Sequence, residues 1–179
     1  MPFFTSSDHF PEIPERRELK AAAQQLVLAL RKQKLTLSTA ESCTGGYIAE
    51  ILTSIPSASQ VYLGGVVSYT NGVKVLALHV PHETLETYGA VSEQTAAFMA
   101  EGAVALTGSD MAVSVTGLAG PDGDDRGNPV GTVFISIAHK GHYTRIYRLP
   151  KLDGSRDEIR RQVVDKALSL IHRYLEELL

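Results

Sequence analysis

The residues best suited to chemistry in this sequence form a short turn rich in hydroxyl groups and glycine. Residues 41–46 read Glu-Ser-Cys-Thr-Gly-Gly and lie between an apolar segment that predicts a strand and a segment, 47–55, that predicts a helix. Gly45 and Gly46 let the backbone approach a ligand closely, and a helix start offers unpaired N–H groups and partial positive charge to an anion. The hydroxyl of Ser42 stands where these features meet, so this turn is a candidate reactive site.

The same turn has a purely structural interpretation. Ser42 or Thr44 could cap the helix that follows, because Ser and Thr are common N-cap residues. No lysine follows Gly46 and no Gly-x-Gly-x-x-Gly is present, so a triphosphate or dinucleotide loop is not supported. The rest of the chain has to decide between a cap and a reactive site.

Further segments combine polar side chains with predicted strand ends or helix starts. They are residues 66–71 followed by Lys74, and residues 89–92, 114–121 and 154–156. Ligands of an open α/β sheet bind beyond the carboxyl ends of the strands. We therefore expect the segments at strand ends to share one site with Ser42.

Each of these residues also has a structural alternative. Tyr69 could close the edge of the core, Lys74 judged alone would be a solvated surface lysine, and Thr116 could belong only to a turn. Arg156 could be an ordinary helix-start residue, although a cation there opposes the helix dipole. This small loss of helix stability suggests that Arg156 has a role other than forming the helix start.

The sequence indicates no metal site. Asp122, Asp124 and Asp125 have the composition of a calcium loop, but they lack the EF-hand spacing and its final Glu, so a solvated loop is expected. The six histidines show no metal-ligand spacing. We assign neither a metal nor a cofactor.

Alternating helices and strands must position the candidate residues. Helices are predicted at residues 15–34, 45–55, 71–78, 81–88, 92–106 and 157–178, and strands at 35–40, 61–69, 111–115, 130–139 and 142–149. This alternation favours an α/β domain, and a hairpin at Lys140-Gly141 makes the sheet mixed. We expect a single-domain three-layer α/β/α sandwich at residues 14–179 after an N-terminal arm at residues 1–13.

Composition restricts the classes of function. The chain has 179 residues, of which 44% are hydrophobic, and can bury a sizeable core. Its net charge of −3 and lack of an aromatic-basic patch argue against direct nucleic-acid binding. A single cysteine, Cys43, fits a reducing compartment, and neither a signal peptide nor a membrane span is recognisable. We expect a cytoplasmic protein with no membrane or nucleic-acid partner.

A set of motifs, taken in order, resembles the CinA C-terminal domain family. They are the turn 41–46, Tyr69-Thr70-Asn71 with Lys74, Gly89-Ala90-Val91-Ser92, Thr116-Gly117 with Ala119-Gly120-Pro121, Pro129 with Gly131-Thr132, and Arg160-Arg161-Gln162. The resemblance covers nearly the whole chain from the first predicted helix on. Members include nicotinamide-nucleotide amidases of the PncC type, which hydrolyse nicotinamide mononucleotide to nicotinate mononucleotide and ammonia. The domain also occurs behind a molybdopterin-binding-like domain, for which this chain is too short.

The resemblance implies a Ser-Lys acyl-enzyme mechanism. Ser42 would be the nucleophile, and Lys74 would be its base if burial lowers the pKa of the amine. Tyr69 would relay a proton or orient Lys74, and Thr116 would hold the substrate amide or the base. Cys43 is the competing nucleophile beside Ser42.

The implied substrate-binding residues are Thr44, Gly45, Gly46, Gly117 and Arg156. Backbone N–H groups at residues 43–46 are candidates for an oxyanion hole or for phosphate, and the sequence does not apportion them. Arg156 matches a family position that contacts the nucleotide, and phosphate suits its guanidinium.

Two other functions stay open. One is a non-catalytic nucleotide- or phosphate-binding module, and the other is an interaction protein supporting DNA uptake or repair. The joint presence of Ser42, Tyr69, Lys74 and Thr116 favours the amidase. We expect a small-molecule nucleotide as ligand and a homo-oligomer, most simply a dimer.

Overall fold

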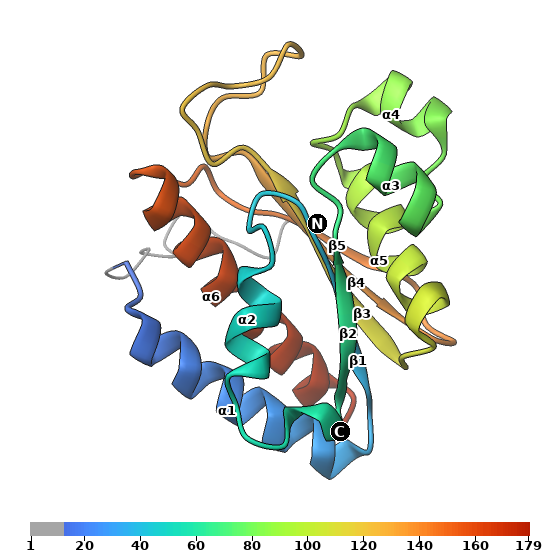
Figure 1. Ribbon diagram of the computed structural model, residues 1–179, viewed down its shortest axis with the longest axis vertical. Helices are drawn as coiled ribbons and strands as arrows, with labels where there is room; N and C mark the ends of the chain where they lie inside the picture. The colour runs from blue at the N-terminus through green and yellow to red at the C-terminus, as the bar shows by residue number, and fades with distance from the viewer. Residues whose placement is uncertain (1–12) are drawn as a thin grey trace.

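A five-stranded mixed sheet forms the middle layer of the protein in a computed structural model that describes residues 13–179 (Figure 1). Its strands are β1 (Leu37–Glu41), β2 (Tyr62–Val67), β3 (Met111–Gly117), β4 (Val133–His139) and β5 (Arg145–Arg148). The strand order is β2-β1-β3-β4-β5. Strands β2, β1 and β3 are parallel to one another, β4 is antiparallel to β3, and β5 is antiparallel to β4. The α/β class and the mixed sheet are confirmed.

Helices cover both faces of this sheet. They are α1 (Arg16–Gln33), α2 (Tyr47–Thr53), α3 (Asn71–Leu78), α4 (His82–Tyr88), α5 (Glu93–Thr107) and α6 (Arg156–Glu177), with a short 3₁₀ helix at Ala58–Gln60. Helices α1, α2 and α6 lie on one face, and α3, α4 and α5 lie on the other (Figure 1). The three-layer sandwich is therefore the observed architecture.

The central strand β3 shows why the layers pack closely. Met111, Val113 and Val115 join the large core beneath α1, α2 and α6. The opposite face carries the small residues Ala112 and Ser114, so α5 can lie near the strand, and the Ser114 hydroxyl donates to a carbonyl of α5. Small side chains on one face thus bring the α3–α5 layer close to the sheet.

The predicted strand at residues 130–139 begins later than expected, at Val133. A turn occupies the preceding residues, because the N–H of Thr132 donates to the carbonyl of Pro129 and that of Gly131 to Leu118. A Cβ at Gly131 would lie 1.9 Å from the carbonyl oxygen of Leu152, so this turn requires glycine. The turn forms the base of the long loop that follows β3.

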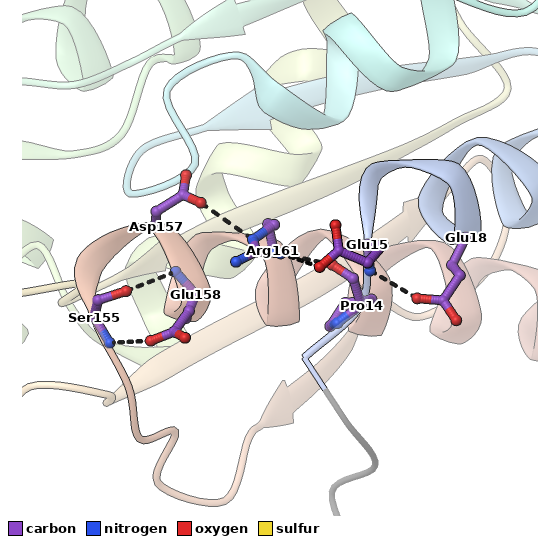
Figure 2. Close-up of polar contacts among 7 residues, drawn as sticks. All are labelled: Pro14, Glu15, Glu18, Ser155, Asp157, Glu158 and Arg161. Atoms are coloured by element: carbon purple, nitrogen blue, oxygen red, sulfur yellow. Dashed lines mark hydrogen bonds and ion pairs between the residues drawn. The ribbon is translucent and has the colours of Figure 1, made fainter.

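The first turns of α1 and α6 lie next to each other and are joined by Arg161 (Figure 2). The capping box predicted from Ser155 and Glu158 is confirmed at the start of α6. The Arg161 guanidinium pairs with Asp157 at 3.1 Å and donates to the carbonyl of Pro14 at 3.3 Å. The orientation of α6 is therefore fixed at the end that carries Arg156.

The predicted arm at residues 1–13 lies outside the described residues except for Ile13. From residue 13 onward, none of the helices combines the length and the apolar character needed to cross a bilayer.

Candidate active site

The carboxyl ends of the three parallel strands meet at one edge of the sheet, where a pocket of about 270 Å³ lies. Ser42 follows β1 directly, Tyr69 follows β2, and Gly117 ends β3. The segment before α5 contributes Ala90, and the start of α6 contributes Arg156. The structure thus brings together the segments that the sequence analysis assigned to a common site.

Lys74 and Ser42 contact each other inside this pocket. The Lys74 Nζ lies 3.2 Å from the Ser42 Oγ and donates to the carbonyl of Ser68 at 2.6 Å. Thr70 caps α3 and places Lys74 in its first turns, facing the sheet. The lysine side chain is only 1% exposed, so the alternative of a solvated surface lysine is wrong.

Burial prepares Lys74 to act as a base. Removal from water lowers the pKa of its amine to about 8, because the charged form loses hydration. Among the described residues no carboxylate forms an ion pair with the amine that would offset this effect. A lysine in this pKa range is partly neutral near physiological pH, and the neutral amine can accept the proton of a neighbouring hydroxyl.

Cys43 also lines the pocket, but its thiol is poorly suited to attack. Burial raises the pKa of Cys43 to about 12, and the nearby negative charge of Glu41 adds to this effect. Because the thiolate is the reactive form, a thiol that stays protonated is a weak nucleophile. The local environment therefore favours Ser42 over Cys43.

Thr116 joins the end of β3 to the segment before α5. Its hydroxyl donates to the carbonyl of Ala90 at 2.6 Å, and the side chain is 1% exposed. The hydroxyl oxygen keeps acceptor capacity for a ligand in the pocket. The next residue, Gly117, allows close packing, because a Cβ there would lie 2.6 Å from the carbonyl oxygen of Thr132.

Arg156 and Tyr69 form the outer rim of the pocket. One Nη of Arg156 donates to the Tyr69 hydroxyl at 2.9 Å, and the other donates to the carbonyl of Gly120. Tyr69 is 58% exposed, so it does not close the core. Within the described contacts Tyr69 hydrogen-bonds Arg156 and not Lys74. Its placement fits a role in positioning Arg156 better than one in orienting the lysine.

Neither Ser42 nor Thr44 caps α2, whose N-cap position is occupied by Gly46 with φ of 92°. The groups at the helix start are instead bound by the carboxylate of Glu41. It accepts from Thr44 Oγ1 at 2.6 Å, from the N–H groups of Gly46 and Ile48 at 3.0 Å, and from that of Ala49 at 2.8 Å. Sequence analysis assigned Glu41 no role, because a glutamate at a strand end is usually exposed.

Three predicted substrate-binding residues therefore lie outside the pocket lining, namely Thr44, Gly45 and Gly46. Their polar groups serve the turn, since the Gly45 N–H donates to the Ser42 carbonyl at 3.1 Å and the Thr44 carbonyl accepts from Arg160 at 2.8 Å. A direct role in substrate binding stays a prediction for these residues. The geometry favours a role in shaping the turn.

Arg126, to which the sequence analysis assigned no role, connects the acidic loop after β3 to α4. The guanidinium of Arg126 donates to the carbonyl of Thr87 at 2.9 Å and to carbonyls of the neighbouring residues. Asp124 organises the loop by accepting from the N–H and Nδ2 of Asn128. Nowhere in residues 13–179 do His, Cys, Asp and Glu side chains gather in a group that could hold a metal ion.

Comparison with known proteins places this chain in a family. Residues 19–175 match the family described as the CinA C-terminal domain. The CinA-like protein of Thermotoga maritima is 43% identical over 151 residues, which cover 84% of this chain and 36% of that protein. The chain thus spans only about 36% of the length of such curated relatives.

Solved structures match over most of their length. The competence/damage inducible protein CihA from Agrobacterium tumefaciens is 39% identical, with a TM-score of 0.84 and coverage of 91% of this chain and 97% of that one. A competence-damaged protein (CinA) superfamily protein from Klebsiella pneumoniae is 31% identical, with a TM-score of 0.86 and coverage of 89% and 98%. These names state no reaction, so the chemistry has to be argued from the site.

Proposed function

Since the chain belongs to the CinA C-terminal domain family, we propose that it is a nicotinamide-nucleotide amidase that converts nicotinamide mononucleotide and water to nicotinate mononucleotide and ammonia. The observation that carries the proposal is the buried Lys74 amine 3.2 Å from the Ser42 hydroxyl. A carboxamide is an unactivated acyl group, and a serine attacks it only when a base removes the hydroxyl proton.

The reaction proceeds in two half-reactions. The Ser42 Oγ bonds to the carboxamide carbon while its proton passes to the Lys74 Nζ and the carbonyl oxygen becomes an oxyanion. The C–N bond then breaks, Lys74 returns the proton to the nitrogen, and ammonia leaves an acyl ester on Ser42. Water attacks this ester with Lys74 again as base, and the carboxylate product is released as Ser42 recovers its proton.

The two ends of the pocket suit the two ends of the substrate. Lys74 is buried and Ser42 is half-buried, whereas Arg156 is exposed at the rim. Two of the five guanidinium N–H donors of Arg156 go to Tyr69 and Gly120, and the others can bind a phosphate. The nicotinamide therefore enters first and the nucleotide phosphate stays at the mouth.

Ammonia release tests the proposal. Purified protein is incubated with nicotinamide mononucleotide without added metal, and a chelator is included in a parallel sample. We expect ammonia in both samples. Folded protein that binds the nucleotide but releases no ammonia between pH 6 and 10 would instead be a non-catalytic binding module.

A further inference from the structure

Glu41 is a buried carboxylate next to the nucleophile, and the proposed mechanism does not use it. Its side chain is 1% exposed, and within the described part of the chain no basic side chain forms an ion pair with it. A buried charge is costly unless hydrogen bonds compensate it. Here four donors do so, one hydroxyl and three backbone N–H groups.

These bonds determine which N–H groups of the turn stay available to a ligand. The N–H groups of Gly46, Ile48 and Ala49 bind Glu41, and that of Gly45 binds the Ser42 carbonyl. Among the described residues of the turn 43–46, only Cys43 and Thr44 have N–H groups without an acceptor in another residue. Thr44 is fully buried and does not line the pocket, whereas Cys43 does, so the Cys43 N–H is the one left for a ligand. The N–H that follows a nucleophilic serine is a common oxyanion donor.

Glu41 also contacts the side of the site that carries the base. Its backbone carbonyl accepts from the N–H of Ser68 at 2.8 Å, and the carbonyl of Ser68 accepts from the Lys74 amine at 2.6 Å. The residue therefore connects the turn that carries Ser42 to the segment that holds Lys74.

We propose that Glu41 is a positioning residue that folds the turn 42–46 so that the N–H group of Cys43 serves as the oxyanion donor. This inference rests on the proposed amidase function. The inference also indicates how the substrate is oriented. The carboxylate of Glu41 already binds the N–H groups at the start of α2, so the phosphate of the substrate would bind Arg156 instead.

The chemistry of the side chain makes the inference testable. In Glu41→Gln one acceptor oxygen becomes an NH₂ group that faces N–H or O–H donors, so the turn has to rearrange although shape and volume are kept. Glu50→Gln is the matched control, because Glu50 lies on α2, whose start Glu41 binds, and its carboxylate pairs with Arg16 at the surface. Thr44→Val is a second variant that removes one donor and keeps the charge of Glu41.

We expect Glu41→Gln to lower kcat for nicotinamide mononucleotide by on the order of 100-fold, the scale of a lost oxyanion donor. KM should change less than about threefold, and the pH midpoint set by Lys74 should stay in place. Thr44→Val should lower kcat roughly threefold to tenfold, the scale of one hydrogen bond. Glu50→Gln should behave as wild type. Thermal unfolding confirms that each variant is folded at the assay temperature.

A fluorophosphonate probe gives a readout that does not depend on the substrate. The Ser42 Oγ bonds to phosphorus as fluoride leaves and the hydroxyl proton passes to Lys74, and the P=O oxygen takes the oxyanion position. Labelling should slow in Glu41→Gln in proportion to kcat. If the wild-type protein is labelled on Ser42 but releases no ammonia, the proposed amidase function is refuted. The labelling rates of wild type and Glu41→Gln then still test whether Glu41 positions the oxyanion donor.

An unchanged kcat and labelling rate in folded Glu41→Gln would overturn the inference, and so would a loss confined to KM. If Glu41→Gln does not fold, Thr44→Val tests the inference instead. A folded Thr44→Val protein with the kcat and labelling rate of wild type would show that the hydrogen bond to Glu41 does not matter for catalysis, and would contradict the inference.

Discussion

The Lys74 amine donates a hydrogen bond to the Ser42 hydroxyl across 3.2 Å, although the two residues are 32 positions apart in sequence. One follows strand β1 and the other lies in the helix that follows the neighbouring parallel strand β2. Their meeting is a consequence of topology, because parallel neighbours end at the same edge of a sheet. The following predictions depend on this pair and on the groups around it.

Loss of either member of the pair should abolish the same step. Ser42→Ala and Lys74→Ala should each remove nearly all ammonia release, and the double variant should be little worse than either, because residues that act as a unit are strongly non-additive. Initial rates with nicotinamide mononucleotide check this. Additive losses would show that the two residues act independently. Cys43→Ala serves as a control and should retain most of the activity.

The rate should rise with pH through about 8, where Lys74 loses its proton. Only the neutral amine accepts the serine proton, so the acidic limb of kcat/KM reports the pKa of Lys74. A profile of kcat/KM between pH 6 and 10 measures it. A flat profile, or one that falls over this range, would exclude Lys74 as the base.

Stability should follow the same titration with a definite sign. The pKa of Lys74 is lowered from 10.5 to about 8 in the folded protein, so between these values the unfolded chain binds more protons and stability rises with pH. Lys74→Met removes this pH dependence of the free energy of unfolding. Urea unfolding should therefore show Lys74→Met more stable than wild type near pH 7, with the difference shrinking by roughly 1.4 kcal/mol per pH unit above pH 8. A constant difference would contradict the lowered pKa.

Arg156→Ala should weaken the use of a phosphorylated substrate. The expected loss in kcat/KM for nicotinamide mononucleotide is roughly 1.5–3 kcal/mol, the scale of a hydrogen bond to a charged group. Nicotinamide riboside has no phosphate, so we expect its kcat/KM to be lower in the wild-type protein and much less affected by the substitution. Arg17→Ala, at an exposed position of α1, is the matched control. Equal losses on both substrates would assign Arg156 a role other than phosphate binding.

Arg126→Ala should release the loop from α4. The loop contributes Asp122 and Gly120 to the pocket wall, and three carbonyls at the end of α4 hold the guanidinium. Amide hydrogen exchange should increase in residues 118–131, and KM should rise while kcat changes little. An unchanged exchange rate would show that the loop is held by its own turns around Asp124.

Much of the fold was predictable because its signals are local. The buried run from Met111 predicted β3, and Asn71–Leu78 was predicted with the bounds that α3 has. The grouping of Ser42, Lys74, Thr116 and Arg156 followed from their positions at strand ends and helix starts, together with the family resemblance.

The residues that sequence reasoning missed act through tertiary contacts. Glu41 is recognisable as a cap only when the chain has turned back to present the start of α2 to its carboxylate. Arg126 binds carbonyls about 40 residues away, which no periodicity reveals. Gly45 and Gly46 were predicted to contact the ligand because glycine permits close approach. In the structure their N–H groups donate to Ser42 and Glu41, and contact with a ligand stays a prediction.

The docking of α6 against α1 determines when the site becomes complete. Arg161 of α6 reaches the carbonyl of Pro14 across 147 positions, and Gln33 of α1 reaches that of Leu175 across 142. Contacts of such long sequence separation form late, since the intervening chain must first be ordered. Because α6 also carries Arg156, a chain that has formed the Ser42–Lys74 pair still lacks the proposed phosphate-binding residue until α6 has docked. Docking of α6, and not formation of the Ser42–Lys74 pair alone, would then complete the proposed nucleotide site.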